Sequence, residues 1–225
     1  MLYDKDIREP LYEFLEGLYG KVRILEEKNI GGSRADVLMI APGALFGLEI
    51  KSDADSYTRL ASQVRDYDRY CDYCWVVAGS SHAAHVDEHV PAHWGIITVD
   101  EEIADDGPND DAPAAAASPD FYILRRPEKN PADVLRAKLM LLWRFELANI
   151  QAKNELPAYK GKSKDFVREK IFEKVEPDIL HDQISEELFE RDYTTIAQRI
   201  NEYRMANDQK PRRKRKYRRR RKRAV

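Results

Sequence analysis

The segment SRADVLMIAPGALFGLEIK, residues 33–51, decides the fold because it holds two apolar runs that flank the turn-forming dipeptide Pro42-Gly43. Two short runs of apolar residues joined by a turn are typical of a β-hairpin. We therefore predict one strand over residues 36–41 and a second over residues 45–51.

The hairpin is expected to bring two carboxylates together. Alternate side chains of a strand share a face, so Glu49 and Lys51 point the same way. A turn centred on Pro42-Gly43 sets Asp36 directly opposite Glu49, where Cβ atoms are about 4.5–5.5 Å apart. Two carboxylates this close repel each other unless a cation lies between them, and oxygen ligands completed by water suit Mg²⁺ or Mn²⁺. Lys51 can then orient an attacking water or neutralise charge that develops on a phosphate.

The alternative is an ordinary charged pair on a solvated strand face, and three features argue against it. Glu49 follows the apolar run of residues 45–48, where an unused charge costs free energy. Gly47 lies on the same face and leaves room for a close approach. The next helix aligns Arg59, Gln63 and Tyr67 on one stripe at i, i+4 and i+8.

The rest of the N-terminal half predicts an α/β fold. Apolar residues at helical spacing between Ile7 and Leu18 predict a first helix, with Asp6-x-x-Glu9 as its cap and Pro10 near its start. Further strands are expected at residues 22–30, 73–78, 94–99 and, as an edge strand, 121–124, and a second helix at 55–70. This order predicts a mixed central sheet with flanking helices.

The C-terminal part, residues 128–208, is expected to be helical. Asn130-Pro131 predicts a cap and a first helical residue, opening a helix that continues through Phe145. Ser163, Pro177 and Thr194 begin three shorter amphipathic candidates. These helices form either a plain packing bundle, which the pattern favours, or a helix-turn-helix or winged module.

Charge divides the chain into a basic tail and an acidic body. Residues 210–223 hold twelve Lys or Arg and no acid, which leaves 26 basic and 40 acidic residues elsewhere, a net charge of −14. We predict a disordered tail over residues 209–225 that binds nucleic acid with a steep salt dependence. Its candidate binding residues are Arg212, Arg213, Lys214, Arg215, Arg218 and Arg219. The alternative is that the tail folds against the acidic body and inhibits it.

Residues 101–120 form an acidic insertion with seven acids, three prolines and no Lys or Arg, which predicts a flexible surface loop. No apolar run reaches the roughly 18–20 residues that cross a bilayer, and the N-terminus is too polar for a signal peptide. The expected location is therefore the cytoplasm, with no membrane partner.

The pattern of Asp36, a spacer and then Glu49-x-Lys51 resembles the PD-(D/E)xK nuclease superfamily. Gln63-x-x-x-Tyr67 resembles the Gln-x-x-x-Tyr motif of its RecB-like members. The wider match is similar to an uncharacterised bacterial and phage family of that superfamily and covers residues 6–124, with a further likeness around Trp143. The resemblance implies an αβββαβ restriction-endonuclease-like core in residues 1–127, with the acidic loop as an insertion.

The resemblance also implies a hydrolase: a Mg²⁺-dependent (or Mn²⁺-dependent) nuclease, with DNA favoured over RNA, in a DNA repair, phage or defence context. Asp36, Glu49 and the carbonyl of Ile50 would hold the metal, and Lys51 would position the attacking hydroxide. The remaining roles are bracing of the site by Gln63 and Tyr67, and phosphate contact by Arg59.

Two departures from the superfamily pattern stand out. Ala35 occupies the position where Pro is the nominal motif residue. Many members also use a carboxylate from the first helix, for which Asp6, Glu9 and Glu13 are candidates here, while Glu26 and Glu27 of the first strand are further possibilities.

The cysteines and histidines form a weaker pattern. Cys71-x-x-Cys74 followed by His82 and His85 resembles a zinc ligand set, but Cys74 falls inside an apolar strand, so buried thiols are the prediction. Two cysteines are also too few for a disulfide framework. His82, His85, His89 and His93 lie about one helical turn apart and predict a polar helix face, with His82 as a rim residue of the site by the family resemblance.

Two functions of other classes compete with the nuclease. One is a non-catalytic nucleic-acid-binding or adaptor protein that acts through the Arg/Lys-rich tail. The other is an interaction protein whose tail binds an acidic partner. An intact Asp, Glu and Lys triad argues against both, because a binding module has no need of it.

Overall fold

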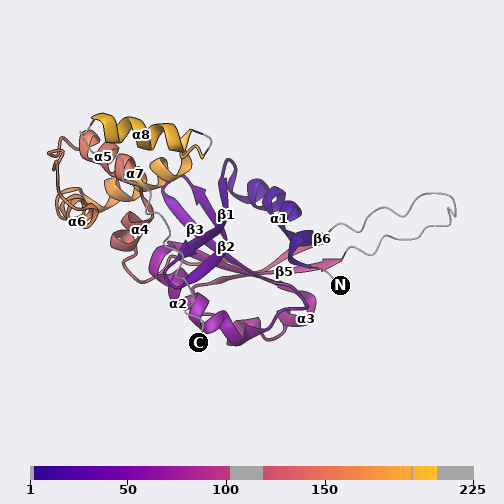
Figure 1. Ribbon diagram of the computed structural model, residues 1–225. Coiled ribbons are helices and arrows are strands. Elements are labelled where there is room, and N and C mark those ends of the chain that lie inside the picture. The colour runs from indigo at the N-terminus through magenta and orange to yellow at the C-terminus, as the bar shows by residue number, and fades with distance from the viewer. Residues whose placement is uncertain (1–2, 102–118, 194, 207–225) are drawn as a thin grey trace, which may run out of the picture. The chain divides into compact units, whose positions relative to one another are not determined.

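The computed structural model describes residues 3–101, 119–193 and 195–206 (Figure 1). The chain divides into two compact units, Met1–Glu190 and Arg191–Val225. The first unit holds the sheet and seven of the labelled helices, and in the second the described residues include α8 (Ile196–Ala206).

The first unit begins with a helix and ends with a helical segment. Its elements in chain order are α1 (Asp4–Tyr19), β1 (Arg23–Ile30), β2 (Ser33–Ala41), β3 (Ala44–Lys51), the 3₁₀ turn η1 (Tyr57–Arg59), α2 (Leu60–Tyr70), β4 (Tyr73–Gly79), α3 (Ser80–Ala83), the 3₁₀ turn η2 (Val86–Glu88), β5 (Gly95–Glu101), β6 (Pro119–Arg125), α4 (Leu135–Leu141), α5 (Arg144–Lys153), α6 (Lys164–Lys174) and α7 (Pro177–Phe189).

The six strands form one mixed sheet in the order β1-β2-β3-β4-β5-β6, which confirms the predicted α/β class. The first three strands are antiparallel, β3, β4 and β5 are parallel, and β6 returns antiparallel to β5. Gly43, at φ 71°, makes the tight turn of the β2–β3 hairpin. The pairs Val37–Leu48 and Ala41–Ala44 give the hairpin the register that its turn predicts.

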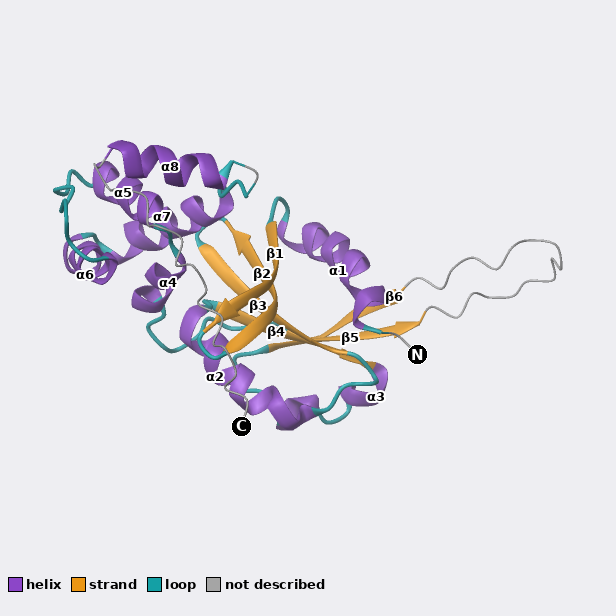
Figure 2. Cartoon of the chain, in the orientation of Figure 1, coloured by secondary structure: helices purple, strands orange, loops and turns teal. Residues whose placement is uncertain are grey.

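Helices lie against both faces of the sheet (Figure 2), and an apolar core fills the space on each face. On one face, Ile7, Leu11 and Leu15 of α1 pack against alternate residues of the central strands. On the other face, α2 and the helices α4 to α7 bury their apolar residues in one continuous cluster. Helices α4 to α7 therefore pack as a bundle on the same core as α2, within the first compact unit.

A buried ion pair joins this helical segment to the strands. Nζ of Lys138 in α4, which is fully buried, lies 2.6 Å from Oδ2 of Asp72. The same carboxylate oxygen accepts the Leu45 N–H at 2.7 Å, and Nδ1 of His181 in α7 lies 3.0 Å from the Lys138 amine. Breaking a buried pair typically costs about 3–5 kcal/mol, so this contact fixes α4 to the strand ends.

One predicted helix is wrong. The helix expected to open at Asn130-Pro131 and run through Phe145 is two helices, α4 and α5, with an extended residue, Leu142, between them. Asn130 does not cap a helix start, because its buried side-chain amide donates to the carbonyls of Asp68 and Cys71 at the end of α2. Its Oδ1 accepts the N–H of Ala132 at 2.9 Å, which makes a local turn, and α4 begins only at Leu135.

The other helix ends follow their local signals more closely. The Ser163 side chain accepts the N–H of Phe166, and Pro177 is the first residue of α7, as predicted. The first helix begins at Asp4, so Pro10 lies inside it rather than at its start. Thr194, the predicted start of a third helix, lies outside the described residues.

Much of the charged sequence also falls outside the described residues. Within the predicted loop 101–120, Glu101 ends β5 and Pro119 and Asp120 begin β6, while the residues between them are outside the described part. The basic tail lies outside it as well. Among the residues that the structure does describe, none belongs to a helix long and apolar enough to span a bilayer.

Candidate active site between α2 and the sheet

Glu49 and Lys51 form a buried pair on the face of β3 that α2 covers. Their exposed fractions are 1% and 4%, and the Lys51 Nζ donates to Glu49 Oε1 at 2.7 Å. Gln63 of α2 completes the cluster, because its Nε2 donates to the same Oε1 at 2.5 Å and its Oε1 accepts from Lys51 at 3.2 Å. The second carboxylate oxygen, Glu49 Oε2, is buried and has no hydrogen-bond partner among the described residues.

Asp36 lies beside this cluster on β2. Its Oδ2 accepts the N–H of Ile50 across the hairpin at 2.9 Å. Burial first, and then the negative charge of Glu49, raise the pKa of Asp36 to about 7, although the Ile50 N–H and Lys51 act in the opposite direction. The two carboxylates thus share one region of low solvent access, as the hairpin register predicts.

Tyr67 of α2 fixes the two strands that carry the acids. Its hydroxyl accepts the N–H of Asp36 at 3.0 Å and donates to the carbonyl of Leu48 at 2.8 Å. Burial and the nearby carboxylates raise the pKa of Tyr67, which keeps the phenol protonated as a donor. The room predicted beside Gly47 is filled by this ring, since a Cβ at Gly47 would lie 2.3 Å from Tyr67 Cδ1.

Ile50 contributes its main chain to the site and its side chain to the opposite core. The contact that the structure shows is the one from its N–H to Asp36, while its side chain packs in the cluster under α1. The structure therefore brings together the predicted residues Asp36, Glu49, Ile50, Lys51, Gln63 and Tyr67.

Arg8 of α1 is a neighbour of the site that the sequence analysis missed. Its Nη1 donates to the Asp36 carbonyl at 3.3 Å, its Nε pairs with Asp4 at 2.9 Å, and its Nη2 pairs with Glu27 at 3.0 Å. The pair of Arg8 with Asp4 has a signal in the sequence, because the two residues stand at i and i+4 of a helix. Glu27, at φ 55°, interrupts the ladder inside β1, between the pairs Glu26–Val37 and Lys28–Ala35, and it also pairs with Arg34.

The family pattern predicts a carboxylate from the first helix at the site, and the structure gives the candidate acids other positions. Asp6 accepts the N–H of Tyr3 at 3.2 Å and is a helix cap, while Glu9 and Glu13 are exposed. Glu26 accepts from the Tyr12 hydroxyl at 2.6 Å.

Asp4 is the α1 acid whose charge acts on Asp36, raising its pKa as the smallest of the named influences. Within the described ranges, no three His, Cys, Asp or Glu side chains converge as a metal-binding group. A cation here would depend on the two carboxylates and main-chain or water oxygens.

The donor set fits a divalent cation nonetheless. Glu49 Oε2 is a buried carboxylate oxygen without a partner among the described residues, and such an orphaned acceptor is costly unless something binds it. The negative charge of Glu49 raises the pKa of Asp36, and a bound cation removes that repulsion. Carboxylate oxygens with added waters are the ligands that Mg²⁺ prefers.

Arg59 lies at a small cavity next to the acids. The cavity, of about 320 Å³, is lined by Gly32, Ser33, Arg34, Asp36, Arg59, Ser62 and Gln63. It shares Asp36 and Gln63 with the cluster, so Arg59 lies next to the acids, and its phosphate contact stays a prediction. The six predicted binding residues of the tail, from Arg212 to Arg219, lie outside the described residues.

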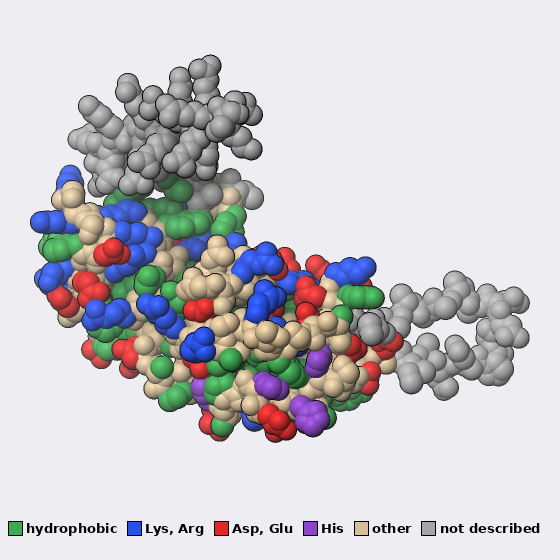
Figure 3. All heavy atoms as spheres, turned by 60° about the horizontal axis from the view of Figure 1, so that its bottom comes forward, with side chains coloured by type: hydrophobic (Ala, Val, Ile, Leu, Met, Phe, Trp, Pro, Cys, Tyr) green, Lys and Arg blue, Asp and Glu red, His purple; other side chains and the backbone are tan. Residues whose placement is uncertain are grey.

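The cysteines and histidines make a separate region. Cys71 and Cys74 are buried free thiols, as predicted, and burial raises the pKa of Cys74. The histidines lie around α3 and η2, where Figure 3 shows several of them on one face. His93 pairs with Asp68 at 3.0 Å rather than with a cysteine, and the helix there is only one turn long.

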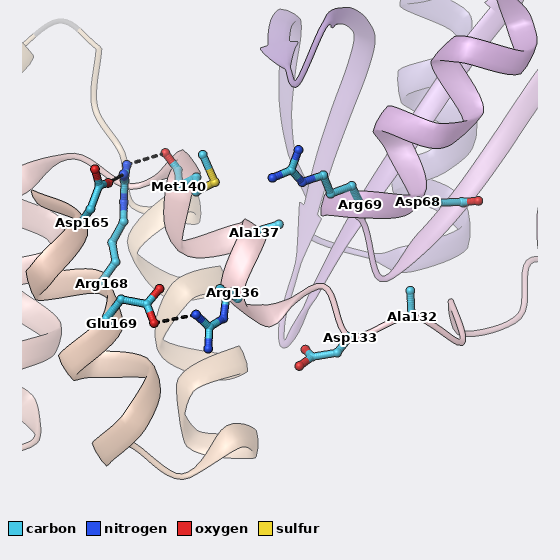
Figure 4. A pocket seen from close by; sticks show the side chains of 10 residues that line it. All are labelled: Asp68, Arg69, Ala132, Asp133, Arg136, Ala137, Met140, Asp165, Arg168 and Glu169. Atoms are coloured by element: carbon cyan, nitrogen blue, oxygen red, sulfur yellow. Dashed lines mark hydrogen bonds and ion pairs between the residues drawn. The ribbon is translucent and has the colours of Figure 1, made fainter.

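A second cavity of about 410 Å³ opens between α2 and the helices α4 and α6 (Figure 4). Two of its three arginines pair with acids, Arg136 with Glu169 at 2.5 Å and Arg168 with Asp165 at 2.7 Å, and the third, Arg69, lies over the ring of Tyr70.

Comparison with known proteins identifies a family. A family model described as Bacteriophage P4 protein cII matches residues 3–212. Among solved structures, the chain is similar to SfsA of Pyrococcus furiosus in complex with Ca²⁺, at 14% sequence identity and a TM-score of 0.30, over 53% of this chain and 59% of that one. The chain thus spans under two thirds of that structure. The comparison with curated proteins gives no match.

Proposed function

The chain belongs to the bacteriophage P4 protein cII family, and within that family we propose that it is a metal-dependent nuclease that hydrolyses phosphodiester bonds, with DNA as the favoured substrate. The observation that carries the proposal is the buried cluster of Glu49 and Lys51 beside Asp36, in which one carboxylate oxygen of Glu49 lacks a partner among the described residues. Membership of the PD-(D/E)xK superfamily is part of this proposal and rests on the same motifs.

Asp36 and Glu49 would hold the cation, with the carbonyl of Ile50 as a third oxygen donor. A bound Mg²⁺ lowers the pKa of water and stabilises charge on a phosphate oxygen. Asp36 must lose its proton to serve as a ligand, and its raised pKa makes this step dependent on pH near neutrality.

Lys51 supplies the positive charge of the protein itself. Its ammonium has three donors, of which Glu49 and Gln63 engage two, and the third can orient the attacking water or the scissile phosphate. Gln63 holds Lys51 and Glu49 in place, and Tyr67 holds the two strands at a fixed separation. Arg59 would neutralise charge on the phosphate backbone.

The test is incubation of the purified protein with plasmid, linear and single-stranded DNA in Mg²⁺, Mn²⁺ or EDTA, beside the Glu49→Gln variant. We expect cleavage by the wild type in Mg²⁺ or Mn²⁺, none in EDTA, and none by the variant. Absence of cleavage with either metal, or equal cleavage by the variant, would contradict the proposal.

The run of twelve basic residues in 210–223 favours one second candidate, a nucleic-acid-binding protein without catalysis. That function predicts salt-sensitive DNA binding that is indifferent to Glu49 and to metal. The same incubation separates the two candidates, because only the nuclease changes the length of the DNA.

A further inference from the structure

The cavity beside Asp36 has two arginines from different parts of the chain. Arg34 begins β2, and Arg59 ends η1 at the start of α2. The Arg34 side chain is 65% exposed, and its pairing with Glu27 is through Nε. Arg59 is also exposed. A guanidinium presents several donors in a plane that matches the oxygens of a phosphate.

The walls of the cavity are fixed to each other by Asp66 of α2. The Ser33 hydroxyl donates to Asp66 Oδ2 at 2.5 Å, which ties the β1–β2 turn to the helix. Gly31, at φ 58°, lies so close that a Cβ there would be 2.2 Å from Asp66 Oδ1. Ser62 donates to the Arg59 carbonyl at 2.7 Å. These contacts set the positions of the backbones that carry Arg34 and Arg59 before any ligand binds.

The cavity lies directly beside the proposed catalytic cluster. Asp36 and Gln63 belong both to the cavity lining and to the acid–lysine cluster. A strand whose scissile phosphate lies at Asp36 and Glu49 would therefore place a neighbouring phosphate in the cavity. The cavity of Figure 4 is unsuited to this role, because none of the residues that line it belongs to the acid–lysine cluster.

We propose that the cavity between Arg34 and Arg59 is a subsite for one backbone phosphate next to the scissile phosphate of a nucleic-acid strand. This inference rests on the proposed nuclease function and adds Arg34, the Asp66 contacts and a substrate requirement to it. The requirement is a charged phosphate adjacent to the bond that is cut. A strand can use the binding energy of its neighbouring phosphate in the transition state, whereas a small diester has no such group. The strand should therefore be cleaved faster than the small diester.

The experiment compares Arg34→Ala, Arg59→Ala and their double variant with Arg65→Ala, all as full-length proteins. Arg65 is the matched control, since it is an exposed arginine of α2 that does not line the cavity. Each protein cleaves an oligonucleotide with normal linkages and one with a single uncharged methylphosphonate beside the preferred cut. The same pair of oligonucleotides is bound in EDTA.

We expect the methylphosphonate to weaken cleavage and binding by the wild type and by Arg65→Ala about tenfold, as for a lost hydrogen bond to a charged group. With the normal strand, the double variant should cleave and bind about tenfold more weakly than the wild type. Introducing the methylphosphonate should not weaken the double variant any further. Arg34→Lys and Arg59→Lys should recover part of the loss, which separates a lost contact from a misfolded variant.

The subsite is overturned if the methylphosphonate costs the double variant as much as the wild type, or if Arg65→Ala loses as much as the double variant with the normal strand. Hydrolysis of bis(p-nitrophenyl) phosphate, which has no neighbouring phosphate, distinguishes the two proposals. Metal-dependent hydrolysis of this diester by the wild type, lost in Glu49→Gln, retains the nuclease even if the subsite fails. If nothing is cleaved, the nuclease fails, and binding in EDTA still decides the subsite.

Discussion

At the scale of single residues, the free energy of the site depends on which charges surround Glu49. Lys51 donates to one of its carboxylate oxygens, and the other, also buried, has no hydrogen-bond partner among the described residues. The protein without metal therefore holds a buried carboxylate that is only partly satisfied. Substitutions at Glu49 and Lys51 should differ in how they respond to metal.

Glu49→Gln and Lys51→Ala should both lower the thermal stability in EDTA, by up to about 3–5 kcal/mol, because each leaves a buried charge without its partner. Mg²⁺ should restore the stability of Lys51→Ala, whose carboxylates remain, and leave Glu49→Gln unchanged. Cleavage by Lys51→Ala should still fall by about 10²–10³. Thermal unfolding with and without Mg²⁺, beside cleavage assays, checks both. Equal recovery by the two variants would show that the metal binds elsewhere.

The titration of Asp36 gives a prediction with a definite sign. Its pKa is raised to about 7, so the folded protein without metal favours the protonated acid. The stability that this group contributes is complete below the ordinary Asp pKa of about 3.9 and is lost as pH rises through about 7. A cation competes with that proton, so its affinity should increase over the same range.

The increase in melting temperature caused by Mg²⁺ should therefore be larger at pH 8 than at pH 6 in the wild type. Asp36→Asn should abolish most of that difference. Differential scanning fluorimetry across pH 5.5–8.5 measures it. An equal effect of Mg²⁺ at both pH values would mean that Asp36 does not hold the cation.

Sequence periodicity was sufficient to pair Asp36 with Glu49, because a two-residue turn and an alternating pattern leave one register for the hairpin. It was insufficient for Arg8, whose contacts with Asp36 and Glu27 depend on how α1 packs against the sheet. The left-handed backbone of Glu27 has no local sequence signal, since most such positions are glycines.

At the scale of elements, α2 is the part that assembles the site from two strands. Tyr67 contacts the main chain of both β2 and β3, and its ring occupies the space that Gly47 leaves. The spacing of Gln63 and Tyr67 could be predicted from helical periodicity. The start of α4 at Leu135 could not, because the side-chain amide of Asn130 donates to carbonyls at the end of α2.

Tyr67→Phe should keep the packing of the ring and remove the hydroxyl that joins the strands. The Asp36 N–H and the Leu48 carbonyl then lose a partner, at a cost of about 1–3 kcal/mol. Cleavage should fall with stability, since Asp36 loses its support. Chemical denaturation measures the effect, with Tyr122→Phe as the control because Tyr122 is 53% exposed. Equal stability of the two variants would show that the Tyr67 hydroxyl does not hold the two strands together.

At the scale of the whole molecule, the strongest concentration of positive charge in the sequence is distant from the candidate site along the chain. The described site lies in the first unit, whereas the basic run of residues 210–223 lies in the second. The mixed sheet followed from the element order, and the shared core of α2 with α4 to α7 required the tertiary contacts. A run of basic residues predicts binding to a polyanion but does not identify which polyanion is bound.

Removal of residues 210–225 should weaken DNA binding and reduce its dependence on salt, because fewer counterions are then released. Mg²⁺ binding and the thermal stability of the first unit should be retained. Fluorescence anisotropy at 50–300 mM salt measures the change against the full chain. Unchanged affinity and salt slope would exclude the tail as the electrostatic anchor, whereas faster cleavage would support an inhibitory tail.

The central claim is that Asp36 and Glu49 hold a divalent cation, and calorimetric titration of Mn²⁺ at pH 8 tests it most directly. We predict one site in the wild type, the same site in the control Glu9→Gln, whose carboxylate is exposed on α1, and loss of the site in Glu49→Gln. Absence of Mn²⁺ binding to the wild type, or equal binding to Glu49→Gln, would contradict the account.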